Sequence, residues 1–179
     1  LKFFFLSTLT ASSIKFNDGS NINDKNEYVG EDNEIIVENA IAAYFSSNHL
    51  SSLNGENVID VYKDSKIETT LKVYTKNLSN EDGTIKFSGN TDDVYMNIKS
   101  VDRYKIVKVE IQVNKIYDDL DFYSDSYDQS NKIVEKFEKV NTSFTGEYVL
   151  STKTDSLIIL NNTSYDVGIV SIIVYLTNV

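Results

Sequence analysis

Residues 104–114 read Tyr-Lys-Ile-Val-Lys-Val-Glu-Ile-Gln-Val-Asn, and this stretch decides the fold class. Apolar side chains occupy every second position from Val107 to Val113, and polar ones occupy the positions between, from Lys108 to Gln112. A period of two is typical of a β-strand with one face in the core and one face in water. The stretch therefore predicts a half-buried strand in which Lys108, Glu110 and Gln112 face solvent.

The same alternation recurs along much of the chain, between clusters of Gly, Asn, Asp and Ser that are typical of turns. Further strands are expected at Val58–Tyr62, Ile67–Val73, Val94–Ile98, Glu147–Leu150, Ser156–Leu160 and Gly168–Leu176. Many short strands with regular turn signals indicate an all-β fold, an antiparallel β-sandwich that is jelly-roll-like. No linker or fixed-period repeat divides the chain, so we expect a single domain over residues 1–179.

Three segments do not follow the simple alternation of half-buried strands. Residues 34–45 contain a strand at Ile35–Val37, which we expect to be followed by irregular or helical chain. Thr84–Phe87 follows an Asp-Gly turn and is expected to pair back onto the strand at Ile67–Val73. Residues 115–135 interrupt the alternating pattern and are expected to form a long acidic, tyrosine-rich loop.

Composition narrows the class of protein. The chain has 179 residues and a formal net charge of −10, which repels phosphate backbones and argues against a nucleic-acid partner. It has no cysteine, so disulfides, thiolate metal sites and cysteine nucleophiles are excluded. It has no run of about 18–20 apolar residues, so we expect no membrane span.

The N-terminal residues 1–16 begin with an apolar run. Residues 1–12 carry one lysine, an apolar run and then small residues, an order that resembles a secretory signal. We interpret the segment instead as an extended strand that remains part of the folded protein. Its apolar side chains would form an assembly arm that pairs in its own sheet or in that of a neighbour, namely Leu1, Phe3, Phe4, Phe5 and Leu6.

The loop at 115–135 is the strongest candidate for a site, because long loops in compact domains often carry function. Hard cations prefer several carboxylate oxygens, and the loop is rich in aspartate. Candidate calcium ligands are Asp118, Asp119, Asp121, Asp125 and Asp128. The alternative is a solvated acidic loop, because the aspartates lack the spacing of an EF-hand. Calcium is the one cofactor that the sequence suggests.

The same loop holds three tyrosines, Tyr117, Tyr123 and Tyr127. Tyrosine offers a flat apolar face and a polar tip, which suits stacking on a sugar or contact with another protein. The alternative is that these rings pack the loop onto the sheet.

Signals for catalysis are weak. His49, the single histidine, lies in a Ser- and Asn-rich stretch without a sequence motif that frames a nucleophile. The many carboxylates show no spacing that selects a catalytic pair. We therefore expect a protein that is not an enzyme and has no catalytic residues.

Two strand motifs resemble those of secreted bacterial carbohydrate-binding-like β-sandwich modules. The matching stretches are Tyr104–Ile111 and the closing Ile169-Val170-Ser171-Ile172-Ile173-Val174-Tyr175, within a region of about 67–177. The resemblance implies a sandwich fold and an extracellular, cell-surface or virion-exterior location. It carries no ligand-binding residue across.

Two functions follow as expectations. The first is a non-catalytic structural subunit of an extracellular or virion-surface assembly, such as a filament, appendage or capsid-exterior protein. Its partners would be copies of itself or neighbouring subunits, bound through strand and sheet contacts. The alternative is a carbohydrate-binding or adhesion module that recognises a cell-surface glycan through the 115–130 loop.

Overall fold

A computed structural model describes residues 40–114, 120–133, 136–139 and 146–178. The strands and short 3₁₀ helices in this part of the chain are β1 (Ile41–Phe45), η2 (Ser47–His49), β2 (Gly55–Lys63), β3 (Lys66–Lys76), β4 (Ser79–Glu81), β5 (Thr84–Phe87), β6 (Tyr95–Ser100), β7 (Tyr104–Asn114), β8 (Asp121–Ser124), η3 (Gln129–Asn131), β9 (Lys136–Lys139), β10 (Gly146–Thr154), β11 (Ser156–Leu160) and β12 (Val167–Asn178). In these ranges no helix is long and apolar enough to cross a membrane.

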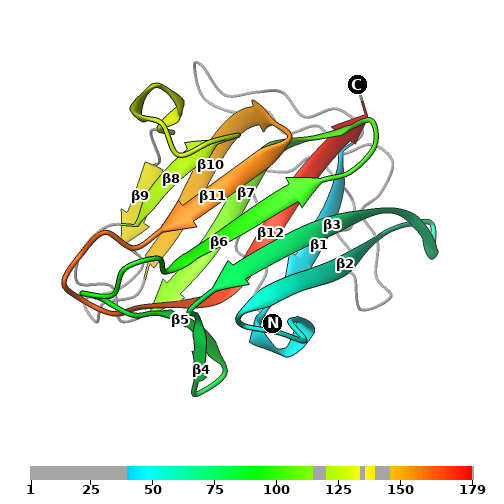
Figure 1. Cartoon of the computed structure of the whole chain (residues 1–179). Coiled ribbons are helices and arrows are strands. Elements are labelled where there is room, and N and C mark those ends of the chain that lie inside the picture. Colours follow the sequence, from blue (N-terminus) through cyan, green and yellow to red (C-terminus); the bar gives the residue numbers. More distant parts are fainter. Residues whose placement is uncertain (1–39, 115–119, 134–135, 140–145, 179) are drawn as a thin grey trace.

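The strands form two antiparallel sheets that pack face to face (Figure 1). One sheet has five strands in the order β2-β3-β6-β11-β8 and lies at the front of Figure 1. The other has the order β4-β5-β12-β7-β10-β9, with β1 also paired to β12. The predicted all-β sandwich is thus confirmed, and its jelly-roll refinement stays a prediction.

The core lies between the sheets and is built from alternate residues of each strand. In the seven-stranded sheet, Val109 lies opposite Val174 and Ile111 opposite Ile172. In the five-stranded sheet, Val73, Ile98 and Leu157 form one row across β3, β6 and β11. All of these side chains are buried, and each contributes about 1.5–3 kcal/mol through removal of apolar surface from water.

The expectation that the polar face of the strand at 104–114 is in water is wrong. Lys108 is 2% exposed and Glu110 is 4% exposed, and their charged groups form an ion pair with 2.5 Å between Nζ and Oε1. The Tyr175 hydroxyl donates to Glu110 Oε2 at 3.2 Å, and Lys108 Nζ lies 5.3 Å from the centroid of the Tyr175 ring. Buried charges persist when they are paired and hydrogen-bonded, and this cluster meets both conditions.

Local expectations also needed correction. Ile41–Phe45 is strand β1 rather than irregular or helical chain, because its alternate side chains enter the core while its backbone pairs with β12. β5 pairs with β4 and β12, not with the strand at 67–73, which belongs to the other sheet. The segment 115–135 is not all loop, because β8 and η3 lie within it and β8 pairs with β11.

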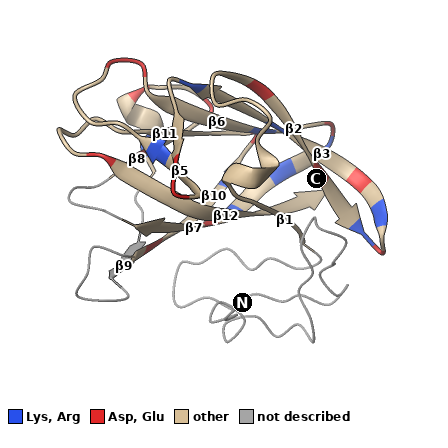
Figure 2. Ribbon diagram, turned by 90° about the horizontal axis from the view of Figure 1, so that it is seen from below, with Lys and Arg blue, Asp and Glu red and all other residues tan. Residues whose placement is uncertain are grey.

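Turns are made without proline, as the composition requires. Asp, Asn and Ser take the left-handed conformation at several turns, because their short polar side chains tolerate it. The non-glycine residues with positive φ are Asp64, Ser65, Asn77, Asp82, Asn90, Asp93, Asp102 and Asp125. In Figure 2 acidic residues lie in several of the loops at the strand ends.

Candidate functional site

The outer face of the five-stranded sheet carries a row of side chains that crosses four strands. Tyr74 lies opposite Asn97, Asn97 opposite Ile158, and Ile158 opposite Tyr123. Because side chains alternate between faces, these residues point away from the core that Val73 and Ile98 enter. The row thus places aromatic, amide and aliphatic groups side by side on one surface.

A second row lies beside the first. Tyr95 of β6 is opposite Leu160 of β11, and Leu160 is opposite Asp121 of β8. β6 and β11 run antiparallel, so the start of β6 and the end of β11 lie at the same end of the sheet (Figure 1). The loops that flank this end, residues 88–94 and 161–166, are therefore neighbours in space.

These rows and loops enclose a cavity of about 580 Å³, which we call the outer-sheet groove. Its floor is Tyr95, Asn97, Ile158 and Leu160, its walls are residues 90–94 and 161–164, and Tyr127 also lines it. Small-molecule sites commonly occupy about 300–1,000 Å³ and combine apolar surface with a few placed polar groups. The outer-sheet groove falls in this volume range, and it combines an apolar floor with walls in which most of the residues are polar.

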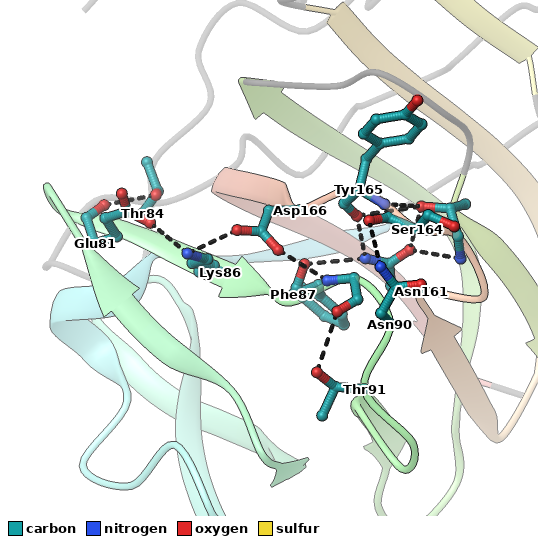
Figure 3. A network of polar contacts seen from close by, with 12 residues as sticks. Glu81, Thr84, Lys86, Phe87, Asn90, Thr91, Asn161, Ser164, Tyr165 and Asp166 are labelled. Atoms are coloured by element: carbon teal, nitrogen blue, oxygen red, sulfur yellow. Dashed lines mark hydrogen bonds and ion pairs between the residues drawn. The ribbon is translucent and has the colours of Figure 1, made fainter.

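Backbone and side-chain hydrogen bonds hold the two walls together (Figure 3). The Asn90 amide donates to the Thr163 carbonyl at 3.1 Å, and the Asn90 side chain donates to the Ser164 carbonyl at 3.2 Å. Gly89 N–H donates to Asp166 Oδ1 at 2.8 Å. Loops separated by more than 70 residues of chain therefore act as one wall.

Asn161 is the centre of this network, as Figure 3 shows. It is 6% exposed, and its amide group donates to the carbonyls of Phe87 at 3.0 Å and Tyr165 at 2.8 Å. Its own carbonyl accepts from the Thr163 backbone amide at 3.0 Å and from the Thr163 hydroxyl at 2.8 Å. One buried side chain thus shapes the loop 161–165 and joins it to the end of β5.

Lys86 stabilises the same wall through two ion pairs. Its ammonium lies 2.7 Å from Asp166 Oδ2 and 2.9 Å from Glu81 Oε2. The hydrogen bond to Asp166, followed by that to Glu81, raises the pKa of Lys86 above its ordinary value. Asp166 therefore links β5 to the Gly89 amide.

Gly89 lets the walls approach closely. A Cβ atom at this position would overlap the carbonyl carbon of Ser164 and lie 2.5 Å from its oxygen and from Tyr165 N. These are backbone atoms, which cannot rotate away as a flexible side chain can. Any larger residue at position 89 must separate the walls.

Two groups on the groove have hydrogen-bonding capacity to offer a ligand. Asn97 Oδ1 accepts from the Ser156 hydroxyl at 2.6 Å, which orients the amide, while the Asn97 NH₂ group meets no acceptor among the described residues. Likewise, the Tyr95 hydroxyl has no hydrogen-bond partner in the described part of the chain. Amide and phenol groups can satisfy both the donors and the acceptors of a ligand.

Two of the three tyrosines predicted from the 115–135 segment lie at or beside this site. Tyr123 is 3% exposed and Tyr127 is 65% exposed, and their rings meet edge to face with centroids 4.7 Å apart. Burial raises the pKa of Tyr123. The exposed Tyr127 ring therefore packs against a buried ring beside the groove. Tyr117 lies outside the described residues.

Each of the predicted calcium ligands that the structure describes contacts a different partner within the protein. Asp121 pairs with Lys132 at 2.7 Å, and Asp125 accepts from the Thr154 hydroxyl at 2.5 Å. Asp128 caps η3, where the Ser130 backbone amide and then its hydroxyl hold the pKa of Asp128 below its ordinary value. In the ranges that the structure describes, no three metal-ligating side chains gather, and Asp118 and Asp119 lie outside those ranges. Calcium binding stays a prediction.

The N-terminal arm and His49 are the remaining residues that the sequence analysis considered. The arm residues Leu1, Phe3, Phe4, Phe5 and Leu6 lie outside the described residues. His49 closes the 3₁₀ turn η2, where Nδ1 accepts from the Ser46 backbone amide at 3.2 Å and the ring meets Tyr44 edge to face.

Sequence reasoning did not single out the floor of the groove. Alternation could have shown that Tyr95 and Asn97 point opposite to Met96 and Ile98. It could not have shown that β6 lies beside β11, about 60 residues later in the chain. The wall contacts between residues 89–90 and 163–166 carry no sequence signal at all.

In comparisons with known proteins, no family model, no curated protein and no solved structure matches the chain. Functional inference therefore depends on the geometry and chemistry of the outer-sheet groove.

Proposed function

We propose that the protein is a non-catalytic carbohydrate-binding or adhesion module of an extracellular, cell-surface or virion-exterior structure, and that its ligand occupies the outer-sheet groove. The observation that carries the proposal is the groove itself, with Tyr95, Asn97 and Tyr127 around an apolar floor of Ile158 and Leu160. A sugar has an apolar C–H face and a rim of hydroxyls, so it needs flat apolar contacts and groups that both donate and accept.

Preorganisation supports the same proposal. The walls are held by hydrogen bonds through Asn161 and Asn90, and the Ser156 hydroxyl orients the Asn97 amide. A site that is already ordered loses less conformational entropy on binding than one that must form around its ligand.

A glycan array followed by titration calorimetry tests the proposal. The wild type should bind a defined set of glycans, and Tyr127→Ala should weaken binding at least tenfold, because the ring is exposed and lines the groove. Tyr165→Ala is the matched control. Its ring is also exposed, but it extends away from the polar network in Figure 3 and does not line the groove.

Binding that is equal in the wild type and in Tyr127→Ala would place the ligand elsewhere. An array without any bound glycan would remove the proposal.

A structural subunit of a filament, appendage or capsid exterior remains a second proposal, supported by a different surface. β2 spans nine residues at the edge of the five-stranded sheet, and Val58 on it is exposed. A long edge strand can pair with a strand of another subunit. Light scattering should then show an assembly that Val58→Lys weakens. A protein that stays monomeric at high concentration would contradict this proposal.

A further inference from the structure

The charged groups around the outer-sheet groove are unevenly distributed. The described residues that line it include two carboxylates, Asp92 and Asp93, and no lysine or arginine. Asp93 Oδ2 lies 2.8 Å from Lys76 Nζ, so that carboxylate is neutralised. Asp92 is exposed, and the described part of the chain offers it neither an ion-pair nor a hydrogen-bond partner. The groove thus has one uncompensated negative charge.

Two nearby lysines make contacts outside the groove lining. Lys132 pairs with Asp121 at 2.7 Å, at the end of the row that begins at Tyr95. Lys99 lies over the Tyr74 ring, with 5.4 Å between Nζ and the ring centroid. Neither lysine is among the described residues that line the groove, so an anionic ligand in the groove would meet a carboxylate and no lining cation, on a chain whose net charge is −10.

From this distribution we infer that the outer-sheet groove selects its glycan by charge: it binds sugars that are uncharged or carry an amine, and it rejects uronic, sialylated or sulfated ones. This inference rests on the proposed function and names the class of ligand for that site. An acidic sugar has to leave water for a site with only neutral donors and a carboxylate of like charge. A free amine gains attraction to Asp92 instead.

The expected size of the effect follows from Coulomb's law. Two unit charges about 6 Å apart at a protein surface, with an effective dielectric constant between about 20 and 80, interact strongly enough to change a binding constant by roughly 3- to 100-fold. We therefore expect about a tenfold preference, and at least a threefold one, for a neutral over an acidic oligosaccharide at low salt. The preference should shrink as salt screens the charge.

The test uses three hexamers with one β-1,4-linked glucan backbone: cellohexaose, the glucosamine hexamer and the corresponding oligouronate. Dissociation constants are measured by calorimetry at about 0.02 M and 0.5 M sodium chloride. The Debye length is longer than its value at physiological salt in the first buffer and shorter in the second. Neutral, amino and acidic glycans of other linkages are compared on the array. At low salt we expect the amine form to bind more tightly than the neutral form, and the oligouronate to bind about tenfold, and at least threefold, more weakly.

Two variants assign the effect to Asp92. Asp92→Asn should remove the advantage of the amine form, and Asp92→Lys should raise the affinity for the oligouronate at least tenfold. Asp60→Lys is the matched control, because it makes the same change in net charge on β2, away from the groove. It should leave the ratio of affinities unchanged.

The outcomes separate the inference from the function beneath it. If glycans bind and Tyr127→Ala weakens them, but acidic and neutral forms bind equally, the charge inference is wrong and the proposed function stands. If Asp92→Lys and Asp60→Lys change the ratio alike, net charge rather than the groove is responsible, and the inference is again wrong. If no glycan of any charge binds, both are overturned.

Discussion

Replacement of Asn161 by alanine is the most direct test of how the groove wall is built. The side chain is 6% exposed and makes four hydrogen bonds, two through its amide group and two through its carbonyl. Each bond lost contributes about 1 kcal/mol, and a buried partner left unsatisfied costs about 1–3 kcal/mol. The Tyr165 carbonyl still accepts from the Thr163 hydroxyl at 3.2 Å, so the variant removes only one of the two hydrogen bonds that this carbonyl accepts.

Taken at about 0.5–1 kcal/mol each, in the lower part of the range for a hydrogen bond because partners near the surface can turn to water, the four bonds sum to a decrease of about 2–4 kcal/mol in the free energy of unfolding. For a chain of this size, that corresponds to a fall in Tm of roughly 4–16 °C. Urea unfolding of the full chain, followed by far-ultraviolet circular dichroism and analysed by linear extrapolation, measures the change. The midpoint should fall while the slope stays the same, because the sandwich still unfolds as one unit.

Asn162→Ala is the matched control. The neighbouring asparagine is exposed, and its amide donates to Asp121 Oδ2 at 2.8 Å, so its replacement should change stability by less than about 0.5 kcal/mol. Asn161→Asp is the second variant, because it keeps the shape of the side chain and removes both donors. If Asn161→Ala costs less than about 1 kcal/mol, or if Asn161→Asp is as stable as the wild type, the hydrogen bonds do not stabilise the wall.

Three other predictions concern different parts of the molecule. Glu110→Ala should lower the free energy of unfolding by roughly 3 kcal/mol, because it removes the carboxylate that pairs with the buried Lys108 ammonium at 2.5 Å; urea unfolding measures this, and a change under about 1 kcal/mol would contradict it. Gly89→Ala should cost roughly 1–3 kcal/mol and shift the amide resonances of Ser164 in NMR spectra, since a Cβ atom overlaps its backbone; unchanged resonances would show that the walls do not touch. Burial, and then the hydrogen bond to a glutamate, raises the pKa of Tyr104 to about 12, so the neutral phenol stabilises the fold below pH 10 and this stabilisation is lost as the pH rises through about 12. Tyr104→Phe should show a smaller loss of stability between pH 10 and 12 than the wild type, and identical losses would refute the shift.

Much of the fold was predictable because strand formation is a local property. The alternation at Ile67–Val73 and Val107–Val113 matches β3 and β7, and the absence of proline correctly predicted turns built on Asp, Asn and Ser. Expectations were wrong where two local solutions were close in energy. Ile41–Phe45 is too short for its period to separate a strand from a helix, and its pairing with β12 decided the matter.

The candidate site was predictable only in part. The long tyrosine-rich segment predicts a surface that includes Tyr123 and Tyr127, and their rings meet beside the groove. The sequence does not indicate Tyr95 and Asn97, because no motif near them in the chain marks them. Their role depends on the register between β6 and β11 and on the wall that Asn161 holds.

The sequence by itself determined that this chain forms strands with one apolar side, because the pleat places successive side chains on opposite faces whatever the strand pairs with. Only the tertiary structure decided that Lys108 and Glu110 are buried together, that β5 joins β12 rather than β3, and that two distant loops wall a groove. The physical reason is that pairing and burial are properties of the whole chain. They depend on which strands can bury the most apolar surface together and satisfy their polar groups, and no short stretch of sequence contains that information.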